Sequence, residues 1–239
     1  MNLIIDIGNT RTKLAVFKGD ELLNSLVSDH VDIESNIEKL YNTYQLKNCI
    51  LASVTKFSPN IDKYKFNIIV KLSHQTKVPF INNYKTPSTL GVDRVALASA
   101  AAYQYPNNNV LIIDSGTCIT YDFINNKNEY LGGAISPGLH LRYKSLHEFT
   151  SKLPLLEQAE YKLIGNDTNS SIHSGVLNGF VQEIDGVISQ YQQKYPNLTV
   201  VLTGGDTNFL AKKLKSSIFA IPSFLLEGLN SILIYNLNE

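Results

Sequence analysis

A short pattern occurs twice in this chain of 239 residues, and it constrains the possible folds more than any other feature. Residues 3–8 read LIIDIG and residues 111–116 read LIIDSG, with the same internal spacing. In each copy an apolar run predicts a buried strand, and the Asp-x-Gly turn after it leads through a Thr into a second and a third strand. Helix and strand patterns alternate after each copy. We therefore predict a tandem duplication of one α/β domain, with domains at 1–109 and 110–239.

Hydrophobic periodicity places the remaining elements. Strands are expected at 2–7, 12–18, 21–27, 48–54, 66–72, 117–124, 130–135 and 199–203. Helices are expected at 32–44, 91–103, 139–149, 171–191, 209–214 and 224–235. A loop is expected at 82–90, before the second helix.

Charge and cysteine content narrow the class of protein. Twenty-one Lys and Arg balance twenty-one Asp and Glu, so no global field favours nucleic acid or an anionic membrane. No apolar run approaches the roughly 20 residues of a membrane span. The two cysteines, Cys49 and Cys118, form no CxxC pair. We expect a cytoplasmic protein with neither a nucleic-acid nor a membrane partner.

The first Asp-x-Gly turn has the composition of a phosphate site. Glycine allows backbone N–H groups to approach an anion, a Thr hydroxyl can bind a phosphate oxygen, and a Lys adds positive charge. A carboxylate beside phosphate requires a cation between them, which is usually Mg²⁺ beside ATP. These groups stand in one run: Asp6, Ile7, Gly8, Asn9, Thr10, Arg11, Thr12 and Lys13. A single such turn is also ordinary hairpin sequence, but two copies in matching places favour a nucleotide site between the two halves.

Two further glycine pairs follow strands. Gly204 and Gly205 come directly after the apolar run LTVVL, where an adenine or ribose could lie against backbone. The alternative is a strand-to-helix turn in which Asp206 or Thr207 caps the next helix. The segment GGAISPGL at 132–139 also leads from a strand to a helix and could form the floor of the same cleft.

An acidic and a basic residue stand at the head of a predicted helix. Asp93 could accept the proton of a substrate hydroxyl, and Arg94 could bind a carboxylate with two parallel hydrogen bonds. The alternative is that Asp93 stabilises the helix N-terminus while Arg94 is solvated.

Five motifs in order make the chain resemble the type III pantothenate kinase family, within the acetate kinase, sugar kinase, Hsp70 and actin superfamily. They are DIGNTRTK at 6–13, LGVDR at 90–94, DSGT at 114–117, GGAISPGL at 132–139 and TGGD at 203–206. The resemblance extends over essentially the whole chain. It implies two ribonuclease H-like domains, phosphorylation of pantothenate at the first step of coenzyme A synthesis, and a homodimer.

The same resemblance implies roles for individual residues. Residues 6–13 and Thr117 would contact ATP, with Mg²⁺ as cofactor. Asp93 would be the catalytic base, and Asp114 would hold a required monovalent cation, K⁺ or NH₄⁺. The residues implied to contact pantothenate are Tyr84, Gly91, Val92, Asp93, Arg94 and Thr168.

The chain departs from the family pattern in two places. The family often reads GRNT before its late threonine, whereas this chain has GNDT at 165–168. Cys118 stands where the family commonly has a small residue, and we expect it to be a small buried side chain.

Two other functions remain open from sequence. One keeps the cleft but changes the reaction: a sugar, acetate or N-acetylhexosamine kinase, or a polyphosphate-type hydrolase. The other is an ATP-binding sensor without catalysis. Asp93 and Arg94 favour a kinase with an anionic acceptor.

Overall fold

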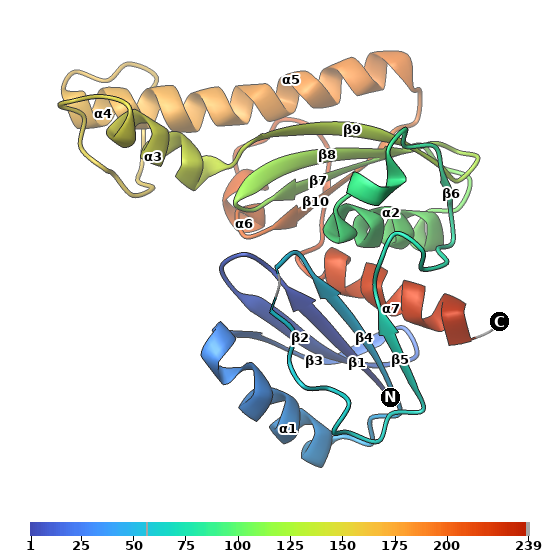
Figure 1. Ribbon diagram of the computed structural model, residues 1–239. Helices are drawn as coiled ribbons and strands as arrows, with labels where there is room; N and C mark the ends of the chain where they lie inside the picture. Colours follow the sequence, from blue (N-terminus) through green and yellow to red (C-terminus); the bar gives the residue numbers. More distant parts are fainter. Residues whose placement is uncertain (56, 238–239) are drawn as a thin grey trace. The chain divides into compact units, whose positions relative to one another are not determined.

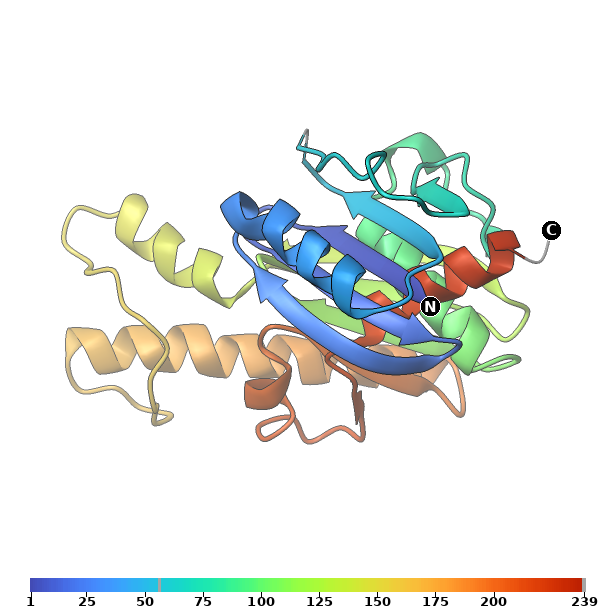
Figure 2. The same ribbon diagram turned by 90° about the horizontal axis from the view of Figure 1, so that it is seen from below.

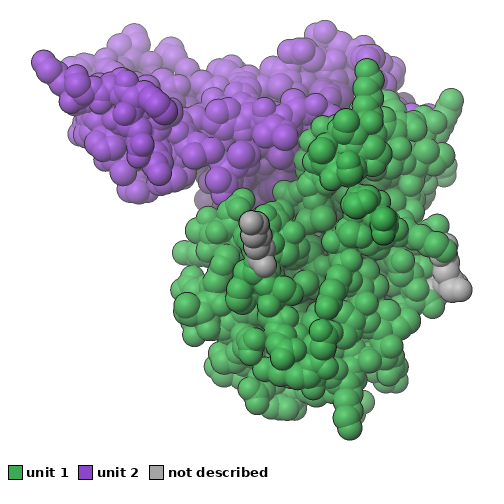
Figure 3. Space-filling model, in the orientation of Figure 1, with its two compact units in different colours: residues 1–107, 127–131, 223–239 green, residues 108–126, 132–222 purple. Residues whose placement is uncertain are grey.

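A computed structural model describes residues 1–55 and 57–237 (Figure 1). They form two compact units (Figure 3), the first of residues 1–55, 57–107, 127–131 and 223–237, the second of residues 108–126 and 132–222. Each unit contains a β-sheet, so the predicted α/β class is confirmed. In the part of the chain that the structure describes, every helix is too short or too polar to cross a membrane.

The first unit contains a five-stranded sheet in the order β3-β2-β1-β4-β5. β1 (Asn2–Ile7) pairs antiparallel with β2 (Thr12–Lys18) and parallel with β4 (Asn48–Ser53). β3 (Glu21–Ser28) and β5 (Ile68–Lys71) form the edges. Every residue of β1 is buried, as expected for a central strand with both faces covered.

Two helices cover the opposite faces of this sheet (Figures 1 and 2). α1 (Ile33–Thr43) presents Ile33, Ile37 and Leu40, which are spaced for one helical face, to the core formed with β1 and β2. α7 (Phe224–Leu237) contacts β1 and β4 and is buried along most of its length.

The helix that carries the predicted acid and base packs on α7. α2 (Val92–Gln104) is buried from Arg94 to Ala102. Gly228 of α7 lies so close to the Ala96 carbonyl that a Cβ there would collide with it. Close backbone approach of the two helices therefore fixes the position of α2 in this unit.

The second sheet has six strands in the order β6-β9-β8-β7-β10-β11, and its last five strands repeat the order of the first sheet. β7 (Val110–Ser115) pairs antiparallel with β8 (Cys118–Ile124) and parallel with β10 (Thr199–Gly204). β9 (Glu129–Pro137) and the short β11 (Phe219–Ala220) complete it. In both sheets the first strand of the meander is central, which matches the repeat seen in the sequence.

The start of β9 belongs to the first unit. Glu129 and Tyr130 pair in parallel with β6 (Ile81–Asn82), a strand at the start of the segment predicted as a loop. Both β6 and β11 are only two residues long, so neither offered the alternation that would have predicted a strand.

The helices of the second unit differ from prediction in their bounds. The helix expected at 171–191 is α4 (Thr168–His173), a π-helical turn (Ser174–Asn178) and α5 (Gly179–Lys194) in continuous succession. It begins earlier because Asp167 and Ser170 form a capping box. The helix expected near 209–214 is present as α6, but it is shorter and begins earlier, at Thr207–Leu210.

The core of the second unit lies between its sheet and α5, which runs along the sheet (Figure 1). Phe180, Ile184 and Ile188 of α5 are completely buried against Leu111 and Ile113 of β7. α3 (Leu139–Glu148) adds Leu139 and Tyr143 to the same core.

Candidate active site

The first predicted phosphate turn joins β1 to β2. The Gly8 N–H donates a 3.0 Å hydrogen bond to the Arg11 carbonyl, which closes the turn and leaves Asn9, Thr10 and Arg11 exposed. The side chains of Ile7 and Thr12 are completely buried.

Asp6 is the last but one residue of β1 and lies opposite Lys13 in the β1–β2 register. Its carboxyl group is buried, with 8% of the residue exposed. Burial raises the pKa of Asp6 to about 6, the Asp93 carboxylate raises it too, and Lys13 opposes the shift. An acid in this environment favours a nearby cation, because the cation offsets the cost of an ionised buried carboxylate.

The first unit thus brings Asp93 within electrostatic range of Asp6, although Asp93 stands far along the chain from β1. Asp93 stands in the first turn of α2, and its Oδ1 accepts a 2.8 Å hydrogen bond from the Arg94 backbone N–H. Gly91, the residue before the helix, lies directly under this carboxylate: a Cβ at Gly91 would collide with Asp93 Oδ1. Glycine at this position therefore allows the observed orientation of the acid.

Arg94 and Tyr84 also meet in the first unit. The Arg94 guanidinium carbon lies 5.8 Å from the centre of the Tyr84 ring, within cation–π range. The Tyr84 ring packs against the Tyr130 ring, with ring centres 6.1 Å apart. The Tyr84 backbone N–H donates a hydrogen bond to the Asn82 side chain. The pair of residues predicted to contact the substrate is thus assembled on one side of α2.

The second predicted phosphate turn follows β7 and is packed against the glycine pair after β10. Gly204 has φ +95°, and a Cβ there would collide with the Ser115 carbonyl oxygen and Asp114 Oδ1. Only glycine accepts both this backbone conformation and this approach. Asp114, Gly204 and Gly205 therefore lie together in the second unit.

The Asp206 carboxylate links the turn after β7 to the turn at the end of β10. Ser115 Oγ donates a 2.8 Å hydrogen bond to Asp206 Oδ2, and the Asp206 backbone N–H binds the Ser115 carbonyl at 3.3 Å. Burial raises the pKa of Asp206, and the Ser115 hydrogen bond opposes that shift. Asp206 does precede α6, but its side chain makes no capping bond to the helix. Its carboxylate binds Ser115 instead.

Thr117 is exposed at the tip of this turn and contacts the GGAISPGL segment through its backbone. The Gly138 N–H donates a 3.2 Å hydrogen bond to the Thr117 carbonyl. A Cβ at Gly138 would collide with the carbonyl oxygens of Gly116 and Thr117. Cys118 is exposed, so the expectation that it is buried was wrong. Its neighbour Ile119 occupies the core position instead.

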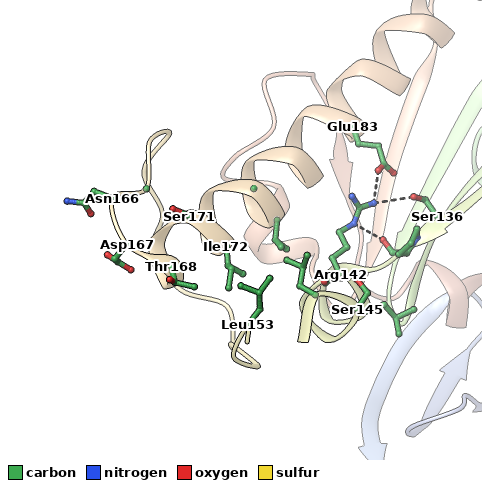
Figure 4. A pocket seen from close by; sticks show the side chains of 16 residues that line it. Ser136, Arg142, Ser145, Leu153, Asn166, Asp167, Thr168, Ser171, Ile172 and Glu183 are labelled. Carbon is green, nitrogen blue, oxygen red and sulfur yellow. Dashed lines mark hydrogen bonds and ion pairs between the residues drawn. The ribbon is translucent and has the colours of Figure 1, made fainter. Parts of the chain in front are cut away.

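Thr168 is the first residue of α4, where it lines a pocket of about 1200 Å³ in the second unit (Figure 4). The pocket is bounded by α3, α4 and α5. Ser136, Arg142 and Glu183 are polar residues at one end of the pocket. Leu153 and Ile172 form part of its apolar wall.

The residues present fit the cations that an ATP site would require. Asp6 and Asp114 are oxygen donors at equivalent ends of β1 and β7, and hard cations prefer oxygen ligands. Among the described residues no three His, Cys, Asp or Glu side chains cluster as a metal site. A cation here would therefore take most of its ligands from phosphate and water, as Mg²⁺ commonly does.

Comparison with known proteins identifies the family. A model of the type III pantothenate kinase family matches residues 2–190. The type III pantothenate kinase of Flavobacterium johnsoniae is 46% identical over 100% of both chains, and that of Christiangramia forsetii is 48% identical over 99% of both. This chain belongs to the type III pantothenate kinase family. The predicted family and enzyme class, a kinase, are confirmed.

Solved structures agree with the fold of this family. A Baf family protein from Campylobacter jejuni is 22% identical with a TM-score of 0.63, covering 99% of this chain and 100% of that one. A glucokinase from an Antarctic psychrotroph is 11% identical with a TM-score of 0.54, covering 98% of both. At these identities the likeness concerns the fold alone.

Several residues around the predicted ones were not predicted. Ser115 binds Asp206, Tyr130 packs on Tyr84, and Arg142 and Glu183 line the same pocket as Thr168. Ser115 stands inside the DSGT motif, so the motif itself could have drawn attention to it. Arg142 and Glu183 are an ordinary helix Arg and Glu, and no local pattern distinguishes them.

Proposed function

We propose that this chain carries out the reaction of its family with Asp93 as general base. It transfers the γ-phosphoryl group of ATP to the hydroxyl of pantothenate, which gives 4′-phosphopantothenate, at the first step of coenzyme A biosynthesis. The observation that carries the proposal is the orientation of the Asp93 carboxylate at the start of α2, held by the Arg94 N–H above Gly91 and electrostatically coupled to the buried Asp6. It joins a candidate base to a candidate phosphate turn within one unit.

Asp93 accepts the proton of the attacking hydroxyl. Its Oδ1 is held by the Arg94 backbone N–H, and it lies over Gly91, so the carboxylate is oriented before substrate arrives. A positioned base contributes about 10²–10⁴-fold to such a reaction.

The Arg94 guanidinium and Tyr84 bind pantothenate. Arg94 presents a planar fork that suits the carboxylate of this substrate, and the Tyr84 ring restricts where the fork can lie. The backbone atoms of Gly91 and Val92, at the start of α2, also contact pantothenate. Thr168 contacts the substrate from its pocket, as the family resemblance implies.

The two Asp-x-Gly turns bind ATP. Residues 6–13 and Thr117 hold the phosphates with backbone N–H groups, hydroxyls and the Lys13 charge, while Gly204 and Gly205 lie along the nucleoside. The same strand order in the two sheets supports two ribonuclease H-like domains that arose by duplication.

Two cations complete the proposed site. Mg²⁺ beside Asp6 neutralises charge on the transferring phosphoryl group when bound. Asp114 holds the monovalent cation, K⁺ or NH₄⁺. Asp6 supplies a buried carboxylate for the first role, and its raised pKa is the state expected of such an acid before a cation binds.

We also propose a cytoplasmic homodimer. Phe149, Leu163 and Ile164 expose 87%, 73% and 81% of their surfaces in the second unit, and exposed apolar side chains of this size often mark an interface. Sedimentation velocity measures the oligomeric state directly, and a monomer at micromolar concentration would reject the dimer.

An acceptor panel tests the reaction. ADP release is measured with pantothenate, glucose, acetate and N-acetylmannosamine as acceptors, each with ATP and Mg²⁺ in potassium buffer. We expect turnover with pantothenate and only background with the others, since Arg94 suits an anionic acceptor of this length. Faster turnover of glucose than of pantothenate would reject the proposed substrate.

A further inference from the structure

Arg142 makes more side-chain contacts than its place on a half-exposed helix would suggest. Its Nη2 lies 2.6 Å from Glu183 Oε2 and donates a 3.1 Å hydrogen bond to Ser136 Oγ, while its Nε donates a 2.9 Å bond to the Pro137 carbonyl (Figure 4). The guanidinium also lies 4.8 Å from the centre of the Phe180 ring. One side chain thus joins α3, α5 and the segment before α3.

Glu183 is itself fixed by a second partner. Its other carboxylate oxygen accepts a 3.0 Å hydrogen bond from the hydroxyl of Tyr121, whose residue is 1% exposed on β8. A carboxylate held from both sides gives Arg142 a rigid anchor. This distinguishes the pair from an exposed ion pair, whose two flexible side chains contribute little.

The segment that Arg142 holds is the one that contacts the second phosphate turn. Ser136 and Pro137 bind Arg142, and the next residue, Gly138, donates its N–H to the Thr117 carbonyl at 3.2 Å. Because a Cβ at Gly138 would collide with that turn, the two backbones are in close contact. A displacement of Ser136–Gly138 would therefore displace Gly116 and Thr117.

We propose that Arg142 is a positioning residue for the nucleotide: anchored on Glu183, it holds Ser136–Gly138 against the Gly116–Thr117 turn and so sets the affinity for ATP. The inference rests on the proposed role of Thr117 in binding ATP. Arg142 need not touch the nucleotide to act in this way. It belongs to the second unit alone, as do all the groups it contacts.

The test is Arg142→Met, which keeps the length of the side chain but removes its charge and its three polar contacts. We expect the KM for ATP to rise about tenfold, the scale of a lost hydrogen-bond network to a charged group, while kcat changes less than about threefold. Arg142→Lys keeps the charge near Glu183 but not the planar fork. Its KM for ATP should therefore lie between the values of the wild type and of Arg142→Met.

Lys144→Met is the matched control. Lys144 stands on the same helix and pairs with Glu148 at 3.7 Å, but both side chains are half-exposed, and the hydrogen bonds of Ser136–Gly138 named above involve neither of them. A general loss of helix charge would affect both Met variants alike, whereas positioning affects only Arg142→Met.

Amide hydrogen exchange, measured without nucleotide, tests directly whether the Gly138 N–H keeps its hydrogen bond to the Thr117 carbonyl. We expect the Gly138 N–H to exchange about tenfold faster in Arg142→Met and unchanged in Lys144→Met. An Arg142→Met protein that is folded and keeps both its ATP KM and its Gly138 protection would overturn the inference. So would an equal rise of the ATP KM in both Met variants.

Thr117→Val separates this inference from the function on which it rests. If Thr117→Val leaves the KM for ATP unchanged, the proposed nucleotide role of Thr117 is wrong. In that case Gly138 exchange alone decides whether Arg142 holds the segment, with faster exchange supporting the positioning and unchanged exchange rejecting it.

Discussion

The Ser115 hydroxyl donates a 2.8 Å hydrogen bond to the Asp206 carboxylate, which joins the turn after β7 to the turn after β10. These turns carry Asp114 on one side and the Gly204–Gly205 pair on the other. The bond also gives a half-buried carboxylate a donor that its burial requires.

Ser115→Ala should therefore weaken both the fold and the nucleotide site. We expect the free energy of unfolding to fall by about 1–2 kcal/mol, because the Asp206 carboxylate loses its donor, and the KM for ATP to rise severalfold. Urea denaturation and steady-state kinetics measure the two effects. Ser189→Ala is the control, since its hydroxyl bonds only the Asp185 carbonyl on an exposed helix face. Equal effects of the two substitutions would contradict a special role for Ser115.

Asp93→Asn should abolish turnover while leaving ATP binding intact. The amide keeps the size of the carboxylate but cannot accept a proton, so we expect kcat to fall about 100-fold or more. Isothermal titration with a non-hydrolysable ATP analogue should give an affinity within a few-fold of wild type. Unchanged turnover would remove Asp93 from the mechanism.

Gly91→Ala tests whether the orientation of Asp93 matters rather than its mere presence. The added Cβ would displace Asp93 Oδ1 from its position over the glycine, so kcat should fall although every charged group is retained. Gly19 is unsuitable as a control site, because its φ of +60° would strain an alanine for a reason unrelated to Asp93. Gly186→Ala is suitable, because a Cβ there has open space on α5.

Asp6 should make the ligand-free protein less stable at neutral pH than its amide variant. The pKa of Asp6 in the folded protein, about 6, exceeds that of an unfolded Asp. Stability is therefore highest when Asp6 is protonated and is lost as the pH rises from about 4 through 6. We expect Asp6→Asn to be more stable by on the order of 2–3 kcal/mol at pH 7.5, with a smaller difference near pH 4.5, and to be inactive. Urea unfolding in EDTA, without nucleotide, measures the difference. A variant less stable than wild type at pH 7.5 would contradict this reading.

Asp114 should make activity depend on a monovalent cation. We expect full turnover in potassium or ammonium buffer and loss of turnover when sodium is the only monovalent cation. Asp114→Asn should be inactive in all three salts, because an amide oxygen carries no net charge to attract the ion. Equal wild-type rates in sodium and potassium would reject the cation role of Asp114.

Local sequence predicted most of the elements and the two Asp-x-Gly turns. β1 and β2 could be predicted because their apolar runs and the Gly8–Asn9–Thr10 turn lie within one short stretch, and the spacing of Ile33, Ile37 and Leu40 similarly predicted α1. The repeat of this pattern at 111–116 then predicted two sheets of the same order.

Tertiary structure alone decided which distant groups meet. Asp93 comes close to Asp6 because α2 packs on α7 and α7 packs on β1 and β4, a chain of contacts that no local pattern encodes. The bond between Ser115 and Asp206 depends on the parallel pairing of β7 with β10, whose register sets Ser115 opposite Gly204. Hydrophobic periodicity shows which face of an element is buried, but it does not show which other element packs on that face. The partners of a polar side chain are therefore known only when the core has placed the elements that carry them.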